Sequence, residues 1–150
     1  MLVLIVSLAL MTVGFYLILL ITGVKPEVRL LLAVVMTFFE LVVLTAVAVL
    51  FSTFVTPIAS SVFTFVVYFI GHSTHLLKQL AAISPSPIVK FIALVLYYVL
   101  PNLSNFNIRG EMVHGVPLNP GALLLSVGYA FVYAFTLLLI SMAVFNRRDF

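Results

Sequence analysis

The 150-residue chain contains no cysteine. A disulfide framework, a thiol nucleophile and a cysteine-ligated metal are therefore excluded. Charge is also scarce, at 7% of residues, whereas soluble domains carry about 25%. Seven Lys and Arg against four Asp and Glu give a net charge of +3. The basic residues are scattered and form no patch, so the sequence indicates no nucleic-acid partner.

Most of the chain is apolar, because 65% of its residues are hydrophobic. A soluble fold could not cover such a chain with polar surface, so the sequence predicts an integral membrane protein. Apolar runs of this length predict an all-α, polytopic membrane protein. We expect residues 1–150 to form a single transmembrane domain in the lipid bilayer.

Four segments are predicted to cross the membrane, namely residues 2–22, 30–51, 56–70 and 121–145. A crossing helix needs roughly 20 apolar residues, and the third segment is shorter than that. Proline suits the first turn of a helix, so Pro57 and Pro120 are expected where the third and fourth helices begin. Four crossings place both chain ends on the same side.

Residues 73–119 are predicted to be a partly helical excursion between the third and fourth spans. Apolar residues between Leu76 and Ile83 fall at helical spacing beside Lys78, which is typical of a short amphipathic helix at the interface. Ser86 and Pro87 suit the start of a second helix, which Pro101 stops. That helix is too short to cross, which favours an interfacial or re-entrant position.

Glu40 lies in the middle of the second predicted span. An ionised side chain there costs on the order of 2.5 to 3.5 kcal/mol on insertion scales. Glu40 is therefore expected to face protein or water. Two interpretations stay open: a residue of a substrate or proton path, and a hydrogen-bonded glutamate that fixes helix packing.

Polar residues recur at every fourth position of the third span, at Thr56, Ser60, Thr64, Tyr68 and His72. This spacing places them along one stripe of a helix. The stripe is a candidate lining for a path. Helix packing is the favoured interpretation, because small hydroxyl residues let membrane helices approach closely and hydrogen-bond across the contact.

Two short motifs could supply metal ligands: His72 with His75, and Glu111 with His114. Nitrogen and oxygen ligands can bind a metal, but each two-residue motif is weak, so we expect no metal site. The chain contains neither H-E-x-x-H nor G-x-S-x-G. A membrane-embedded hydrolase therefore has no visible catalytic group, and an intramembrane or metal-dependent enzyme that uses these four residues stays a third hypothesis.

Three stretches together resemble the C-terminal half of the membrane-spanning permeases of type 2 ABC transporters. They are "ELVVLTAVAVLFSTFVTPIASSVFTFVVYFIGH" (40–72), "LYYVLPNLSNFNIRGEMVHG" (96–115) and the terminal "FNRRDF" (145–150). The resemblance covers nearly the whole chain, and "YYVLPNLSNFNIR" and "RRDF" are its most specific parts. It implies that Pro101, Asn102, Asn105 and Arg109 lie in the connection from an outer helical excursion into the last span.

The resemblance implies a non-catalytic transport subunit that pairs with a second permease subunit, identical or not. A separate ABC ATP-binding subunit would bind ATP and Mg, and this chain would bind no cofactor. The expected location is the plasma membrane, with a cytoplasmic C-terminus. The four spans would be the third to sixth of six, and the first two spans and the coupling helix would precede Met1.

Charge bias taken alone predicts the opposite orientation. Five basic residues are expected on one side of the membrane, Lys25, Arg29, Lys78, Lys90 and Arg109, against Arg147 and Arg148 on the other. We follow the resemblance, because orientation is set over a whole protein. A small structural or assembly subunit of a membrane complex is the alternative function. The sequence identifies no substrate.

Overall fold

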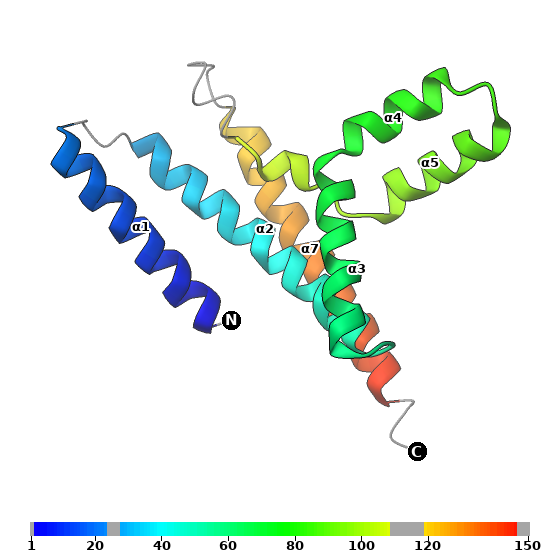
Figure 1. Ribbon diagram of the computed structural model, residues 1–150, viewed down its shortest axis with the longest axis horizontal. Coiled ribbons are helices and arrows are strands. Elements are labelled where there is room, and N and C mark those ends of the chain that lie inside the picture. The colour runs from blue at the N-terminus through cyan, green and yellow to red at the C-terminus, as the bar shows by residue number, and fades with distance from the viewer. Residues whose placement is uncertain (1, 24–27, 109–118, 147–150) are drawn as a thin grey trace. The chain divides into compact units, whose positions relative to one another are not determined.

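The computed structural model describes residues 2–23, 28–108 and 119–146, and this part of the chain is helical with no strand (Figure 1). The prediction of an all-α fold is confirmed. In chain order the helices are α1 (Leu2–Thr22), α2 (Val28–Ser52), α3 (Pro57–His72), α4 (Thr74–Ile83), α5 (Pro87–Val99), the 3-10 turn η1 (Leu103–Phe106) and α7 (Pro120–Asn146).

Two helices of the described chain are long and apolar enough to cross a membrane: residues Leu31–Ser52 of α2 and all of α7. The other two predicted spans also form apolar helices at the predicted positions, α1 and α3. α3 has 16 residues and is about 24 Å long. Crossing by α1 and α3 stays a prediction.

The chain divides into two compact units, and the three breaks between them fall within α2, η1 and α7. One unit comprises residues 1–42 and 106–130. Its buried side chains come from α2, from the 106–108 segment and from α7, and they are Met36, Glu40, Phe106, Ile108, Ser126 and Ala130. Within it the rings of Phe106 and Tyr129 lie 6.3 Å apart between centroids.

The other unit comprises residues 43–105 and 131–150. In it the end of α2 packs against α3, where the rings of Phe51 and Phe63 lie 5.6 Å apart. Four residues connect the two helices, and Pro57 occupies the first turn of α3 as predicted. Because proline has no N–H to leave unpaired, it begins the helix without loss of a hydrogen bond.

α3 passes into α4 through one residue, Ser73, which ends the first helix and begins the second. α4 and α5 then pack against each other as a hairpin (Figure 1). Ala81 on α4 and Ala93 on α5 are buried, whereas most larger apolar side chains of both helices are exposed. The amphipathic helix and the second short helix predicted here are both present.

The predicted helix boundaries hold to within about two residues, and their capping differs. Ser86 is the N-cap residue of α5, as predicted, but its side chain makes no capping bond and its N–H donates to Ser84 Oγ instead (3.3 Å). Asn119 caps α7, because its Oδ1 accepts the Gly121 N–H (3.0 Å). Pro101 follows directly after the C-cap residue of α5.

Candidate functional site

The predicted polar stripe follows α3, and Ser60 is its buried member, with 5% of its surface exposed. The Ser60 hydroxyl donates to the carbonyl oxygen of Ala48 on α2 (2.9 Å). Thr56 is exposed and is the N-cap residue of α3, without a side-chain capping bond. Ser60 thus forms a hydrogen bond between α3 and α2.

Further along the stripe the polar groups bond within α3 itself. The Thr64 hydroxyl donates to the Ser60 carbonyl (2.8 Å). His72 Nδ1 lies 3.2 Å from the Tyr68 carbonyl oxygen, and the two rings are 4.5 Å apart. These local bonds satisfy polar atoms of an apolar helix at the positions that a path would use.

Glu40 is the thirteenth of the 25 residues of α2, and 8% of its surface is exposed. Its position at mid-helix and its burial both agree with the sequence. No buried side-chain nitrogen or oxygen in the described part of the chain lacks a hydrogen-bond partner. Glu40 is therefore buried within the described part of the chain.

A polar cluster that the sequence did not predict joins the start of α4 to the segment after α5. Asn102 Oδ1 accepts hydrogen bonds from Thr74 Oγ1 (2.8 Å) and from Ser104 Oγ (2.5 Å). The two hydroxyl oxygens lie 3.2 Å apart. One carbonyl oxygen has two lone pairs, so it can accept both hydroxyls. Thr74 is almost completely buried, with 1% exposed.

Close packing at the end of α3 surrounds this cluster. A Cβ atom added at Gly71 would lie 2.8 Å from Leu103 Cδ1 and 2.8 Å from the Pro101 carbonyl oxygen. Leu103 and Pro101 are both buried. Only a glycine allows the segment after α5 to lie this close to α3, so Gly71 is required by a close approach of backbone.

α7 also bonds to this region, through the Tyr133 hydroxyl. It donates to the Val99 carbonyl oxygen at the end of α5 (2.9 Å). The last carbonyl groups of a helix have no partner within the helix, and Pro101 prevents α5 from continuing. Tyr133 therefore caps the C-terminal end of α5 from another helix.

The structure brings together only some of the predicted residues. Pro101 and Asn102 join the cluster, whereas Asn105 is exposed. Arg109 lies outside the described residues, as do Glu111 and His114. Within the described part no three His, Cys, Asp or Glu residues are grouped so as to hold a metal ion.

Thr74, Ser104, Gly71 and Tyr133 were missed by the sequence reasoning. Thr74 and Asn102 are 28 residues apart, and Tyr133 and Val99 are 34 apart. No local pattern links such pairs. The one available signal was the group of small polar residues directly after Pro101, which marks a turn whose side chains need partners.

No family model, curated protein or solved structure matches this chain. Ser60, Tyr133 and the Thr74–Asn102 pair bond between different elements, whereas other polar groups bond within their own helix. The described polar groups suit holding helices in place and, at Glu40, offering a titratable group inside an apolar unit.

Proposed function

We propose that this chain is a membrane-spanning permease subunit of an ATP-driven ABC transporter. It lies in the plasma membrane with a cytoplasmic C-terminus, and it works with a second permease subunit and a separate ATP-binding subunit. ATP and Mg bind to that partner, and this chain moves a substrate whose class stays unassigned. The proposal rests on the resemblance of residues 40–72, 96–115 and 145–150 to such permeases.

The order of the helices supports the proposal. The resemblance implies short helices between the last two spans, and the described chain has α4 and α5 between α3 and the 27-residue α7. Neither α4 nor α5 is long enough to cross a membrane. This arrangement is the observation that carries the proposal.

In the proposed transporter Glu40 is the residue most suited to a path. It is the ionisable group at the middle of an apolar helix, and such residues usually serve ions, protons or substrates. The α3 stripe serves packing instead, because Ser60 and Thr64 direct their hydroxyls to backbone carbonyls. The candidate path residue of the proposed permease thus lies on α2 rather than on α3.

Purification of the full chain, tagged and expressed in its native membrane, tests the proposal. We expect an ATP-binding subunit to co-elute at a fixed ratio in mild detergent, and the preparation to hydrolyse Mg-ATP. The same procedure on untagged cells gives the background. Elution without an ATP-binding subunit and without ATP hydrolysis would contradict the permease function.

A structural or assembly subunit of a membrane complex is the second candidate. The hydrogen bond from Ser60 to the Ala48 carbonyl favours it, because this polar contact between helices stabilises packing and needs no transport role. Glu40→Gln separates the two candidates. Loss of ATP-driven transport with an intact complex supports the permease, and loss of the complex itself supports the assembly subunit.

A further inference from the structure

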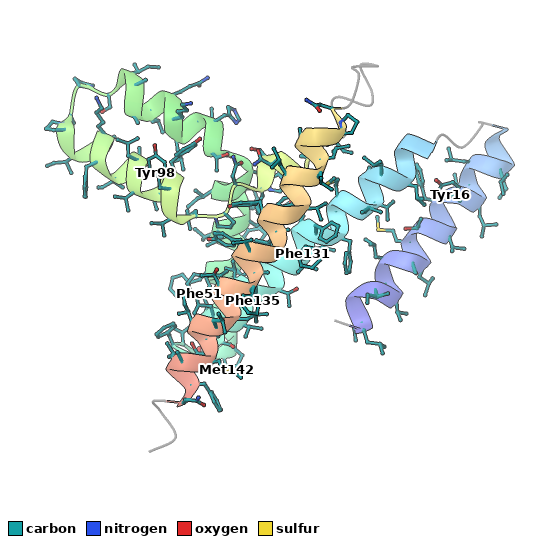
Figure 2. All side chains as sticks on the ribbon, turned by 180° about the vertical axis from the view of Figure 1, so that it is seen from behind. Tyr16, Phe51, Tyr98, Phe131, Phe135 and Met142 are labelled. Carbon is teal, nitrogen blue, oxygen red and sulfur yellow. The ribbon has the colours of Figure 1, made fainter. Side chains whose placement is uncertain are left out.

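The α4–α5 hairpin exposes most of its larger apolar side chains. The two helices pack against each other, and Ala81 and Ala93 are buried. On α5 the exposed apolar residues include Ile88 and Phe91, each with 69% of its surface exposed. Figure 2 shows side chains projecting from both helices of the hairpin, with Tyr98 labelled on α5. A contiguous apolar surface of this kind marks a site of contact with lipid or with another protein.

α4 has three distinct faces. Thr74 and Ala81 lie on the buried face. Leu76, Leu80 and Ile83 follow one another at spacings of four and three residues, so they form an exposed apolar face. A third face is exposed and polar, and it carries His75, Lys78 and Gln79. A short helix with separate polar and apolar exposed faces suits the boundary between water and lipid, where it lies in the plane of the membrane.

Both ends of the hairpin carry groups that favour the level of the lipid headgroups. At the tip, Ser84 and Ser86 lie in the connecting turn, and the exposed Lys90 lies in the first turn of α5. A lysine in the hydrocarbon core is costly, which disfavours entry of the tip into the membrane. At the other end of α5 stand Tyr97 and Tyr98, and tyrosine is enriched at the membrane–water interface. With both ends at one level, the hairpin lies along the membrane surface.

The charge of the hairpin has one sign. Residues 41–108 contain two charged residues, Lys78 and Lys90, and both belong to the hairpin. No Asp or Glu occurs between Glu40 and Glu111 to balance them. Basic residues beside a membrane are attracted to anionic headgroups, and the long lysine side chain can reach them from an apolar surface. A second copy of the hairpin would instead bring like charges together. The charge therefore favours lipid phosphate as the partner.

We propose that the α4–α5 hairpin lies flat in one leaflet, and that Lys78 and Lys90 bind the phosphate groups of anionic lipids. Acyl chains cover the apolar face of α4 and the exposed side of α5. Figure 1 shows the hairpin turning sideways from the end of α3, as a helix pair beside a crossing helix must do to lie in the membrane plane. This lipid contact needs a membrane but no ATP-binding partner, so it is tested separately from the permease function.

Tryptophan fluorescence tests the depth of each face. The chain has no native tryptophan, so single-tryptophan variants of the full chain report without background. Gln79→Trp and Leu80→Trp are neighbours on the polar and apolar faces of α4, Phe91→Trp reports on α5, and Pro85→Trp reports on the tip. All four positions are exposed. Each variant is reconstituted into phosphatidylcholine vesicles with brominated acyl chains, which quench within the hydrocarbon, and iodide is the quencher from water.

We expect brominated chains to quench Leu80→Trp and Phe91→Trp more strongly than Gln79→Trp and Pro85→Trp, and iodide to give the reverse order. Strongest quenching of Pro85→Trp by brominated chains would show that the tip enters the membrane first. Protection of Leu80→Trp and Phe91→Trp from both quenchers would show that protein covers the apolar surface. Either result, or equal quenching of all four variants, would overturn the flat position.

Brominated lipids of two headgroups test the lysines. In mixed vesicles of constant composition, the bromine is carried either by phosphatidylglycerol or by phosphatidylcholine, and the ratio of the two quenching strengths measures the preference for the anionic lipid. We expect Lys78→Gln, measured at Leu80→Trp, to lower this preference about fivefold at low salt. Lys90→Gln, measured at Phe91→Trp, should lower it similarly.

Gln79→Ala is the matched control, because it changes an exposed polar neighbour of Lys78 without changing the charge. It should keep the preference of the Leu80→Trp parent. An unchanged preference in either lysine variant, or an equal loss in Gln79→Ala, would overturn the binding of anionic headgroups by the two lysines.

Discussion

Burial decides how Glu40 can act. At 8% exposure it cannot rely on lipid or bulk water to satisfy its carboxyl group, and in the described part no buried side-chain oxygen lacks a partner. We therefore expect changes to this carboxyl group to disturb the packing around α2.

Glu40→Gln and Glu40→Ala should differ in stability. Glutamine keeps the shape and one acceptor oxygen, so we expect the free energy of unfolding in detergent to change by less than about 1 kcal/mol. Alanine leaves buried partners unsatisfied and should cost roughly 1–3 kcal/mol. Denaturant titration followed by helical circular dichroism measures both variants, and equal stability of the two would contradict a bonded glutamate.

Two adjacent serines on α3 provide a matched pair. Ser60 bonds to α2 through the Ala48 carbonyl, whereas the exposed Ser61 bonds to the Ile58 carbonyl on its own helix. We expect Ser60→Ala to lower the free energy of unfolding by about 0.6–1.5 kcal/mol and Ser61→Ala to leave it nearly unchanged. Detergent unfolding curves compare the two, and similar losses would show that the interhelical bond does not stabilise the protein.

At the scale of the element, α3 and the segment after α5 are held together by close packing rather than by polar bonds alone. The backbone of Pro101 approaches Gly71 so closely that no other residue fits there. The hydrogen bonds from Thr74 and Ser104 to Asn102 Oδ1 then fix the polar side chains that follow. Packing and hydrogen bonding thus act on the same short stretch, residues 101–104.

Gly71→Ala and Gly128→Ala test this contact. The new methyl group at Gly71 would meet Leu103 and the Pro101 backbone, and overpacking of this kind costs roughly 1–3 kcal/mol. At Gly128 nothing lies within 4 Å, so alanine should be neutral or stabilise α7 by up to about 1 kcal/mol. Melting temperatures in detergent report the difference, and equal melting of both variants would exclude a tight contact at Gly71.

Helix positions were largely predictable because they depend on local patterns. Long apolar runs predicted α1, α2 and α7, with Glu40 as an interruption within α2, and the prolines at 57, 87 and 120 predicted the starts of three helices. Side-chain roles at the ends of helices were less predictable. Asn119 caps its helix and Ser86 does not, although both stand directly before a proline.

The candidate site was only partly predictable because its bonds join distant residues. Asn102 drew attention through its neighbours in a polar turn, but its partner Thr74 is an ordinary residue beside Ser73 in the sequence. In the sequence Tyr133 is one of several aromatic residues in an apolar span. Its role follows only from the structure, where its hydroxyl donates to the carbonyl oxygen of Val99 at the end of α5. Such pairings follow from packing, which no local spacing encodes.

At the scale of the whole molecule, the account depends on how many helices cross the membrane. α2 and α7 meet the length that a crossing needs, and α3 at about 24 Å is shorter than a hydrocarbon core of about 30 Å. We propose that α3 crosses nevertheless, because a membrane can thin locally around a short helix at a modest cost. The two ends of α3 then lie on opposite sides of the membrane.

Labelling of single cysteines from one side of the membrane tests this central claim most directly. Phe54→Cys lies before α3, Asn107→Cys after α5 and Asn146→Cys at the end of α7, and all three positions are exposed. The account predicts that an impermeant thiol reagent labels Asn107→Cys in intact cells, and Phe54→Cys and Asn146→Cys only after permeabilisation. Labelling of Phe54→Cys and Asn107→Cys from the same side would show that α3 does not cross, and the four-span permease would be contradicted.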